Sequence, residues 1–290
     1  MTPLPEEKGH PLAYAAGLVQ AAVGPDGSAR AALAIQFAQR FGMALAGVAA
    51  AELTLPVAPP TIGPLAVSGM LDARQAAIEA ELEEAEREFR AVASEYGYPV
   101  GWHAAVDNPV RVLALAARAA DLLIVGRRPE ADRAIAGQYP DPGDVLMQAG
   151  RPVLVVPPSL SHLEAAEVVV AWKDTREARR AVADALPLLR QASGVLVLEI
   201  CETAESLETA ARRVQDVAAH LGRHGVNATP EHRMLREATV AQEVLLAAEE
   251  RRADLIVAGG YGHARLREWA FGGVTRALIR HSPKCCLLSH

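Results

Sequence analysis

Short apolar runs alternate with longer segments of helical pattern through the second part of the chain. The apolar runs predict strands near 167–172, 194–200, 226–235, 254–259 and 284–289. The segments between them predict helices near 175–192, 205–223, 238–252 and 273–281. This alternation is typical of βαβ units that build a parallel sheet.

The first part of the chain repeats this order of elements. Its apolar runs predict strands near 17–23, 44–50, 98–106, 121–126 and 152–156. The exception is the segment 53–70, which is rich in proline, glycine and small apolar residues and predicts a loop over the surface. Residues 72–96 then predict a long helix with a solvated, glutamate-rich face.

The two parts also share local sequence features. The run at 119–126 resembles the run at 252–259, and 27–33 matches 174–180. In the second pair Ser28 or Thr175 caps an alanine-rich helix directly after an apolar strand. Internal duplication is the simplest explanation. We therefore expect one domain over 1–157, a second over 165–290, and a linker at 157–164.

Composition narrows the functional classes. The chain is 51% apolar and 22% charged, which is ordinary for a globular protein. A net charge of −6 without a lysine-rich arm disfavours nucleic acid as a partner. We find neither a signal-peptide pattern nor an apolar run of about 18 residues, so we expect no membrane partner. Cys201, Cys285 and Cys286 make no disulfide framework, which favours a cytoplasmic location.

The most specific motif joins a predicted strand to a predicted helix near the C-terminus. Two residues separate Gly259 from Gly262, and nine separate Gly262 from Gly272, which Gly273 follows. Glycine lets a ligand approach the backbone, and the unpaired N–H groups of the following helix favour a phosphate. No Gly-Lys-Ser/Thr follows, so the motif is not a P-loop, and Arg265 stands where a dinucleotide fingerprint needs its third glycine.

This motif resembles the ATP-binding motif of the universal stress protein family, and Val274 and Thr275 match its usual continuation. The second part of the chain is similar to a universal stress protein domain over its full length, and the first part more weakly. The resemblance implies an α/β fold with two tandem five-stranded parallel-sheet domains, packed about a pseudo-two-fold axis. Each domain would be Rossmann-like and similar to the adenine nucleotide alpha hydrolases.

The resemblance also implies ATP, with or without Mg²⁺, as the ligand of the second domain. Ligands of open sheets bind at the carboxyl ends of strands near the topological switch point. The chain departs from the family at Lys173, where an acidic residue is usual, and at Gly273, where a hydroxyl is usual. The expected nucleotide-binding residues are Ala171, Lys173, Ile200, Gly259, Gly262, His263, Arg265, Gly272, Gly273, Val274 and Thr275.

The first part keeps Asp26-Gly27-Ser28 after its first strand but lacks the glycine loop. Gly126 is followed by Arg127, and the prolines beyond it remove N–H donors. Asp141 and Asp144 would repel a phosphate. We therefore expect no ATP in the first domain.

Four candidate residues have two interpretations each. His263 and Arg265 either contact the phosphates or are solvated loop residues. Ile200 either lines an adenine pocket or belongs to the core. Trp172 could likewise stack on a base or pack in the core.

Two further residue pairs have side chains of types that bind metals or react with oxidants. His220 and His224 are four residues apart, as metal ligands can be, but no third ligand is visible and a surface pair is favoured. Cys285 and Cys286 face opposite ways in a strand, which favours buried, inert thiols over a redox switch.

The sequence thus predicts a stress-response protein that binds ATP in its second domain as a regulatory ligand, and at most a weak ATPase. Its partners would be the nucleotide, an unidentified protein, and a second copy of the chain, paired through an exposed strand edge at 284–289. One alternative is a slow ATPase or nucleotide-dependent transferase using His263 or Asp174. Another is an interaction scaffold that has lost nucleotide binding.

Overall fold

The computed structural model describes residues 13–54, 64–127, 139–236, 238–261 and 273–290. The elements of the first half are β1 (Ala16–Gln20), α1 (Pro25–Phe41), β2 (Ala44–Ala50), α2 (Pro64–Glu95), β3 (Val100–Ala105), α3 (Pro109–Ala116), η1 (Ala117–Ala119), β4 (Leu122–Gly126), α4 (Pro142–Ala149) and β5 (Val153–Val156). Those of the second half are β6 (Glu167–Ala171), α5 (Arg176–Leu189), β7 (Gly194–Cys201), η3 (Ala204–Ser206), α6 (Leu207–Arg223), β8 (Ala228–Met234), α7 (Val240–Glu250), β9 (Leu255–Gly259), α8 (Gly273–His281) and β10 (Cys285–Ser289).

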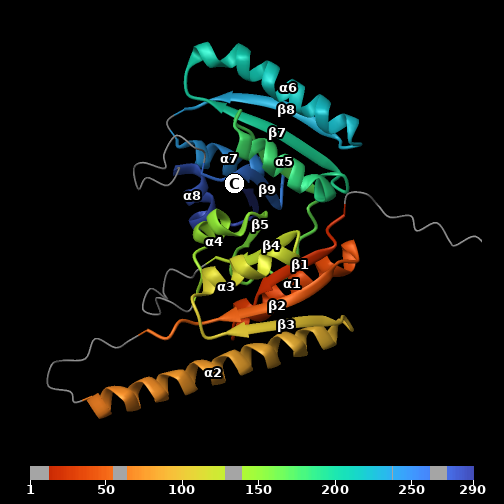
Figure 1. Cartoon of the computed structure of the whole chain (residues 1–290). Coiled ribbons are helices and arrows are strands. Elements are labelled where there is room, and N and C mark those ends of the chain that lie inside the picture. The colour runs from red at the N-terminus through yellow and green to blue at the C-terminus, as the bar shows by residue number, and fades with distance from the viewer. Residues whose placement is uncertain (1–12, 55–63, 128–138, 237, 262–272) are drawn as a thin grey trace, which may run out of the picture.

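The strands of the described residues form one ten-stranded sheet, in the order β3-β2-β1-β4-β5-β10-β9-β6-β7-β8 (Figure 1). Each half contributes five parallel strands, and the two sets meet where β10 pairs antiparallel with β5. The order of the second half repeats that of the first about this junction. The expected pair of five-stranded α/β units with two-fold pseudo-symmetry is therefore confirmed.

Helices cover both faces of the sheet. One buried cluster packs α1, α2, α5 and α6 against the sheet, and a second packs α3, α4, α7 and α8 against the opposite face. Both clusters contain residues of both halves. The central strands are almost wholly apolar, as parallel strands buried on both faces require, whereas the edge strands β3 and β8 are largely exposed.

Three expectations from the sequence are wrong. Ser28 does not cap α1, because the helix begins at Pro25 after Gly24 and Ser28 lies inside it. Residues 64–70 are helical, because α2 begins at Pro64, and a proline is well tolerated at the first position of a helix. The edge expected at 284–289 is not open, because Cys286, Leu287 and Leu288 of β10 pair with β5 of the same chain. That edge therefore offers no surface for a second copy.

The adjacent cysteines behave as expected for strand residues. Cys285 packs in the cluster on one face of the sheet and Cys286 in the cluster on the other. Both thiols are free and buried, and burial raises their pKa values, that of Cys286 to about 12. A thiol that stays protonated is a poor nucleophile, so both are structural residues.

Candidate functional site

The expected site lies where β6 and β9 end side by side. These strands are neighbours, with Ala171 opposite Ala258, so Ala171 and Gly259 come together at the carboxyl edge. The chain leaves β6 into α5 on one face and leaves β9 toward α8 on the other, which makes this point the topological switch of the second half. Ile200 lies on the adjacent β7, two residues beyond the partner of Ala171, and is half-buried.

Among the residues that the structure describes, nothing covers the start of α8 at this edge. Gly273 is exposed, and a Cβ added to it would meet none of their atoms within 4 Å. Val274 is half-buried, whereas Thr275 is only 5% exposed and shares the inner face of α8 with Leu278 and Ile279. The Thr275 side chain is therefore withdrawn from the surface that Gly273 leaves open.

Gly259 has a packing role that its place in the motif does not reveal. A Cβ on Gly259 would stand 2.5 Å from the backbone nitrogen of Ala178 and 2.7 Å from the carbonyl carbon of Glu177. The first turn of α5 thus lies directly on the end of β9. Only a residue without a side chain permits that approach.

The same turn holds a buried carboxylate that the sequence analysis did not single out. Thr175 caps α5 by accepting a hydrogen bond from the Ala178 N–H at 3.3 Å. Glu177 is 2% exposed, and the Arg176 Nε donates to its Oε1 at 2.6 Å. Burial raises the pKa of Glu177, but hydrogen bonds from Arg176, its own backbone and Thr175 outweigh burial and lower it. An anion at a helix N-terminus also suits the helix dipole.

The loop after β6 places three further residues. Lys173 is exposed, and Asp174 forms an exposed ion pair with Arg179 at 2.5 Å. Trp172 is 8% exposed and belongs to the buried cluster beneath α5, so it is a core residue. Of the other expected residues, Gly262, His263, Arg265 and Gly272 lie outside the described residues.

Tyr261 connects this edge to the first half. Its backbone has a positive φ of 47°, and its hydroxyl would lie 2.4 Å from a Cβ added to Gly143 in α4. Burial, together with the nearby Asp141 and Asp144, raises the pKa of Tyr261 to about 12. No sequence pattern pointed to this contact, because it joins residues from different repeats.

The first half closes the equivalent positions with its own groups. Asp141 caps α4 by accepting from the Gly143 N–H at 2.8 Å. The Gly126 N–H, at the end of β4, donates to the Gln20 Oε1 at 2.9 Å. Two backbone N–H donors at this edge are therefore already paired within the first half.

The remaining candidate residues show no arrangement that points to a binding or catalytic role. The rings of His220 and His224 are 4.8 Å apart between centroids at the end of α6. Among the described residues, no group of three His, Cys, Asp or Glu side chains is arranged to hold a metal ion. Within the same residues, no helix is long and apolar enough to cross a bilayer.

The sheet order defines a doubly wound α/β protein. At the switch point of its second half, no described residue covers the N-terminus of α8. Residues 166–290 match the model of the universal stress protein family. The second half of the chain therefore matches that family's model, and the two halves repeat the same α/β fold in tandem.

Two of the solved structures compared are similar over nearly the whole chain. A universal stress protein from Archaeoglobus fulgidus is similar at a TM-score of 0.65 and 16% identity, covering 94% of this chain and 97% of that one. A functionally unknown protein from Pseudomonas aeruginosa is similar at a TM-score of 0.58 and 16% identity, covering 96% and 93%. A universal stress protein in complex with cAMP matches at a TM-score of 0.36 and 22% identity, covering 50% and 97%. No curated protein matches the sequence.

Proposed function

We propose that the second half binds an adenine nucleotide, ATP, at the carboxyl edge of β6 and β9. The observation that carries the proposal is the start of α8, where Gly273 is exposed and no atom of the described residues fills the space beside it. The first N–H groups of a helix have no partner within the helix and carry a partial positive charge. At a topological switch point, this is where α/β proteins hold phosphates.

The residues around this edge fit such a ligand. Lys173 is an exposed cation on the loop after β6 and would attract the phosphates. Ala171 and Ile200 provide apolar surface at the ends of two neighbouring strands for the adenosine moiety. Asp174 would bind Mg²⁺ after breaking its ion pair with Arg179. Gly262, His263, Arg265 and Gly272 complete the proposed set by their position in the motif.

One site per chain follows from the contrast between the halves. Asp141 occupies the N-terminus of α4 in the first half, whereas α8 begins with a bare glycine. A carboxylate at a helix N-terminus satisfies the same N–H groups that a phosphate would use. We therefore assign ATP to the second half alone.

We assign the nucleotide a regulatory role. The carboxylates described at this edge are engaged, Asp174 with Arg179 and Glu177 with Arg176. A base for hydrolysis would first have to leave its partner, which supports at most slow turnover. A ligand that binds one conformation shifts the population toward it, and this suits a stress-response protein that presents different surfaces to a protein partner. A cytoplasmic location remains our prediction.

The test is calorimetric titration with MgATP of the wild type, Gly273→Asp and Gly222→Asp. Gly222 is the matched control, because it is also exposed in a helix, with no atom within 4 Å of its Cβ position, and gains the same charge. We expect one site per chain in the wild type and the control. In Gly273→Asp the affinity should fall at least about tenfold, because a carboxylate replaces open space beside the phosphates.

Each outcome separates the alternatives. If ATP does not bind the wild type, the protein is an interaction scaffold that has lost nucleotide binding. If ATP binds equally to Gly273→Asp, the nucleotide does not lie at the start of α8. Magnesium-dependent phosphate release that is lost in Asp174→Ala would establish the enzyme reading instead.

A further inference from the structure

The first half has a cavity at its own carboxyl edge. Its volume is about 240 Å³, and it lies where β1 and β4 end beside the start of α1. The polar and charged residues that line it are Gln20, Asp26, Arg30, Arg127 and Tyr139. The sheet register makes this edge the counterpart of the β6–β9 edge, because Gly126 occupies in β4 the place of Gly259 in β9.

Arg30 is the unusual residue in this cavity. It is 5% exposed, and its Nε donates to the Gln20 carbonyl oxygen at 2.7 Å. Its Nη2 has no hydrogen-bond partner among the described residues. Burial lowers the pKa of Arg30 to about 10, so the guanidinium still carries its charge at neutral pH. A buried charge without full pairing is costly to the fold.

The end of β4 is shaped around this guanidinium. A Cβ added to Gly126 would lie 2.1 Å from the Arg30 Nη1, so the absence of a side chain at Gly126 makes room for Arg30. In the repeat, Arg30 corresponds to Glu177, whose backbone packs on Gly259. Where the second half buries a fully bonded anion, the first half buries a cation with an unsatisfied donor.

The other charged groups that the structure describes at the cavity do not supply a hydrogen-bonded negative partner for Arg30. Arg127 also lines it, with Nη1 donating to the Ser282 carbonyl oxygen at 2.8 Å. The opposing charge is Asp26, whose Oδ1 accepts from both the N–H and the hydroxyl of Ser159 in the linker. Glu88 accepts from the Gly24 N–H at 2.9 Å, just before α1. Neither carboxylate forms a hydrogen bond with Arg30 in the described structure.

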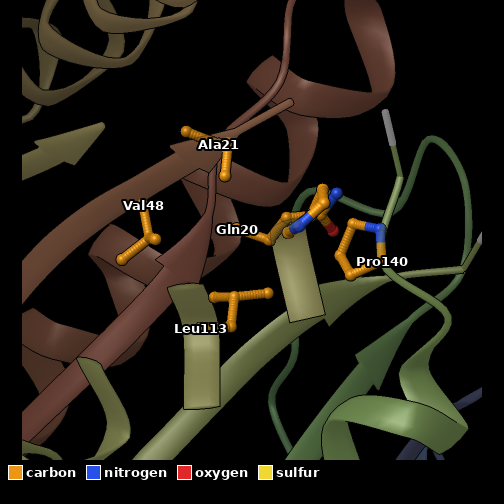
Figure 2. Close-up of a pocket in the computed structure, with 7 residues that line it drawn as sticks. Gln20, Ala21, Val48, Leu113 and Pro140 are labelled. Carbon is orange, nitrogen blue, oxygen red and sulfur yellow. The ribbon is translucent and has the colours of Figure 1, made fainter. Parts of the chain in front are cut away.

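A neighbouring crevice is too small to take a ligand. It shares Gln20 with the cavity and is lined also by Ala21, Val48, Leu113 and Pro140 (Figure 2). Its volume is about 10 Å³, which is room for no more than about one water molecule. Gln20, whose Oε1 accepts from the Gly126 N–H, lines both spaces, and of the two only the larger cavity, beside Arg30, has room for a ligand.

We propose that the first half binds a small oxyanion, a phosphate or carboxylate group, which pairs with Arg30 and Arg127 in this cavity. A guanidinium presents its donors in a planar fork that fits both groups, and the pairing would satisfy the buried charge. The site is distinct from the one proposed for ATP, because it lies in the other half and uses side chains instead of a glycine loop. The cavity is smaller than most drug-sized ligand pockets, which restricts the ligand to a small molecule.

The test is calorimetric titration with inorganic phosphate and, separately, with malonate, at ionic strength held constant with chloride. Arg30→Met removes the buried guanidinium, and Arg127→Gln removes the second one should Arg30→Met fail to fold. Gly273→Asp blocks the helix start in the second half, and Arg118→Gln is a matched loss of an exposed arginine in the first half. We expect saturable binding of at least one probe by the wild type, weakened at least about tenfold in Arg30→Met and severalfold in Arg127→Gln.

Gly273→Asp and Arg118→Gln should bind like the wild type. The stronger of the two probes then identifies the natural ligand as a phosphate or a carboxylate. The proposal is overturned if neither probe binds the wild type. It is equally overturned if Gly273→Asp abolishes binding, or if Arg30→Met or, where that variant does not fold, Arg127→Gln binds like the wild type.

Discussion

At the scale of single residues, the glycines of one motif have different physical roles. Gly259 is enclosed by the first turn of α5, whereas Gly273 borders open space. Both match the spacing of the family motif, yet only the second leaves room for a ligand in the described structure. The spacing of the glycines therefore indicates where side chains are absent. The structure shows whether that space is filled by another helix, as at Gly259, or is left free, as at Gly273.

This difference predicts opposite effects of one substitution. Gly259→Ala should destabilise the protein by about 1–3 kcal/mol, because a Cβ 2.5 Å from the Ala178 nitrogen forces the backbone of α5 to move. The free energy of unfolding from urea titration measures this effect.

Gly273→Ala is the control. Its Cβ would enter empty space at the start of α8, so the stability should stay equal or rise by up to about 1 kcal/mol. Equal losses in both variants would show that contact with α5 is not what distinguishes Gly259.

The buried charges mark the limit of sequence reasoning at this scale. In the sequence, Arg30 and Glu177 each stand two residues after a Ser or Thr in an alanine-rich segment, so both resemble ordinary solvated helix positions. Their burial depends on how closely each helix approaches the neighbouring strand end, which is a contact between segments about 80–100 residues apart. No local pattern carries that information.

At the scale of elements, most of the fold could be predicted. The central strands are buried on both faces and therefore read as continuous apolar runs, which is why their positions were predicted within a few residues. The start of α2 was missed because proline and glycine usually indicate a loop. Pro64 stands at the first helical position, where its missing N–H costs nothing, and Gly69 is exposed.

The two ends of α2 are held very differently. The described side chains of its first part are mostly exposed, Met70 among them at 44%. Its second part packs on the sheet through Phe89, 2% exposed, whose ring lies 5.9 Å from that of Trp102. Gly47 in β2 admits this ring, because a Cβ there would stand 2.7 Å from it.

Phe89→Ala should therefore cost about 3–5 kcal/mol of stability, since it removes a fully packed aromatic side chain and leaves a cavity. Met70→Ala on the same helix should change the stability by less than about 0.5 kcal/mol. Thermal melting of both variants measures the contrast. A large loss in Met70→Ala would mean that the exposed part of α2 is covered in solution.

At the scale of the whole molecule, the two repeats share one sheet and two continuous cores. Leu287 of β10 pairs with Leu154 of β5 at the junction, and both belong to the same buried cluster. Side chains also cross between the halves, as where the Tyr14 hydroxyl donates to the Asp184 carbonyl oxygen at 2.7 Å. Neither half has a complete surface of its own at this boundary, because separating them would expose the edges of β5 and β10.

Unfolding should consequently be one cooperative transition, although chains with two domains often unfold in steps. In scanning calorimetry the calorimetric and van't Hoff enthalpies should agree for the wild type. Leu287→Ala should lower the stability by about 2–5 kcal/mol and still give a single transition, because the leucine serves both halves. Leu115→Ala, at a side chain 53% exposed on α3, is the control and should change little. Two separable transitions, in the wild type or in Leu287→Ala, would mean that the halves fold independently and that the shared strand pair is only a docking contact.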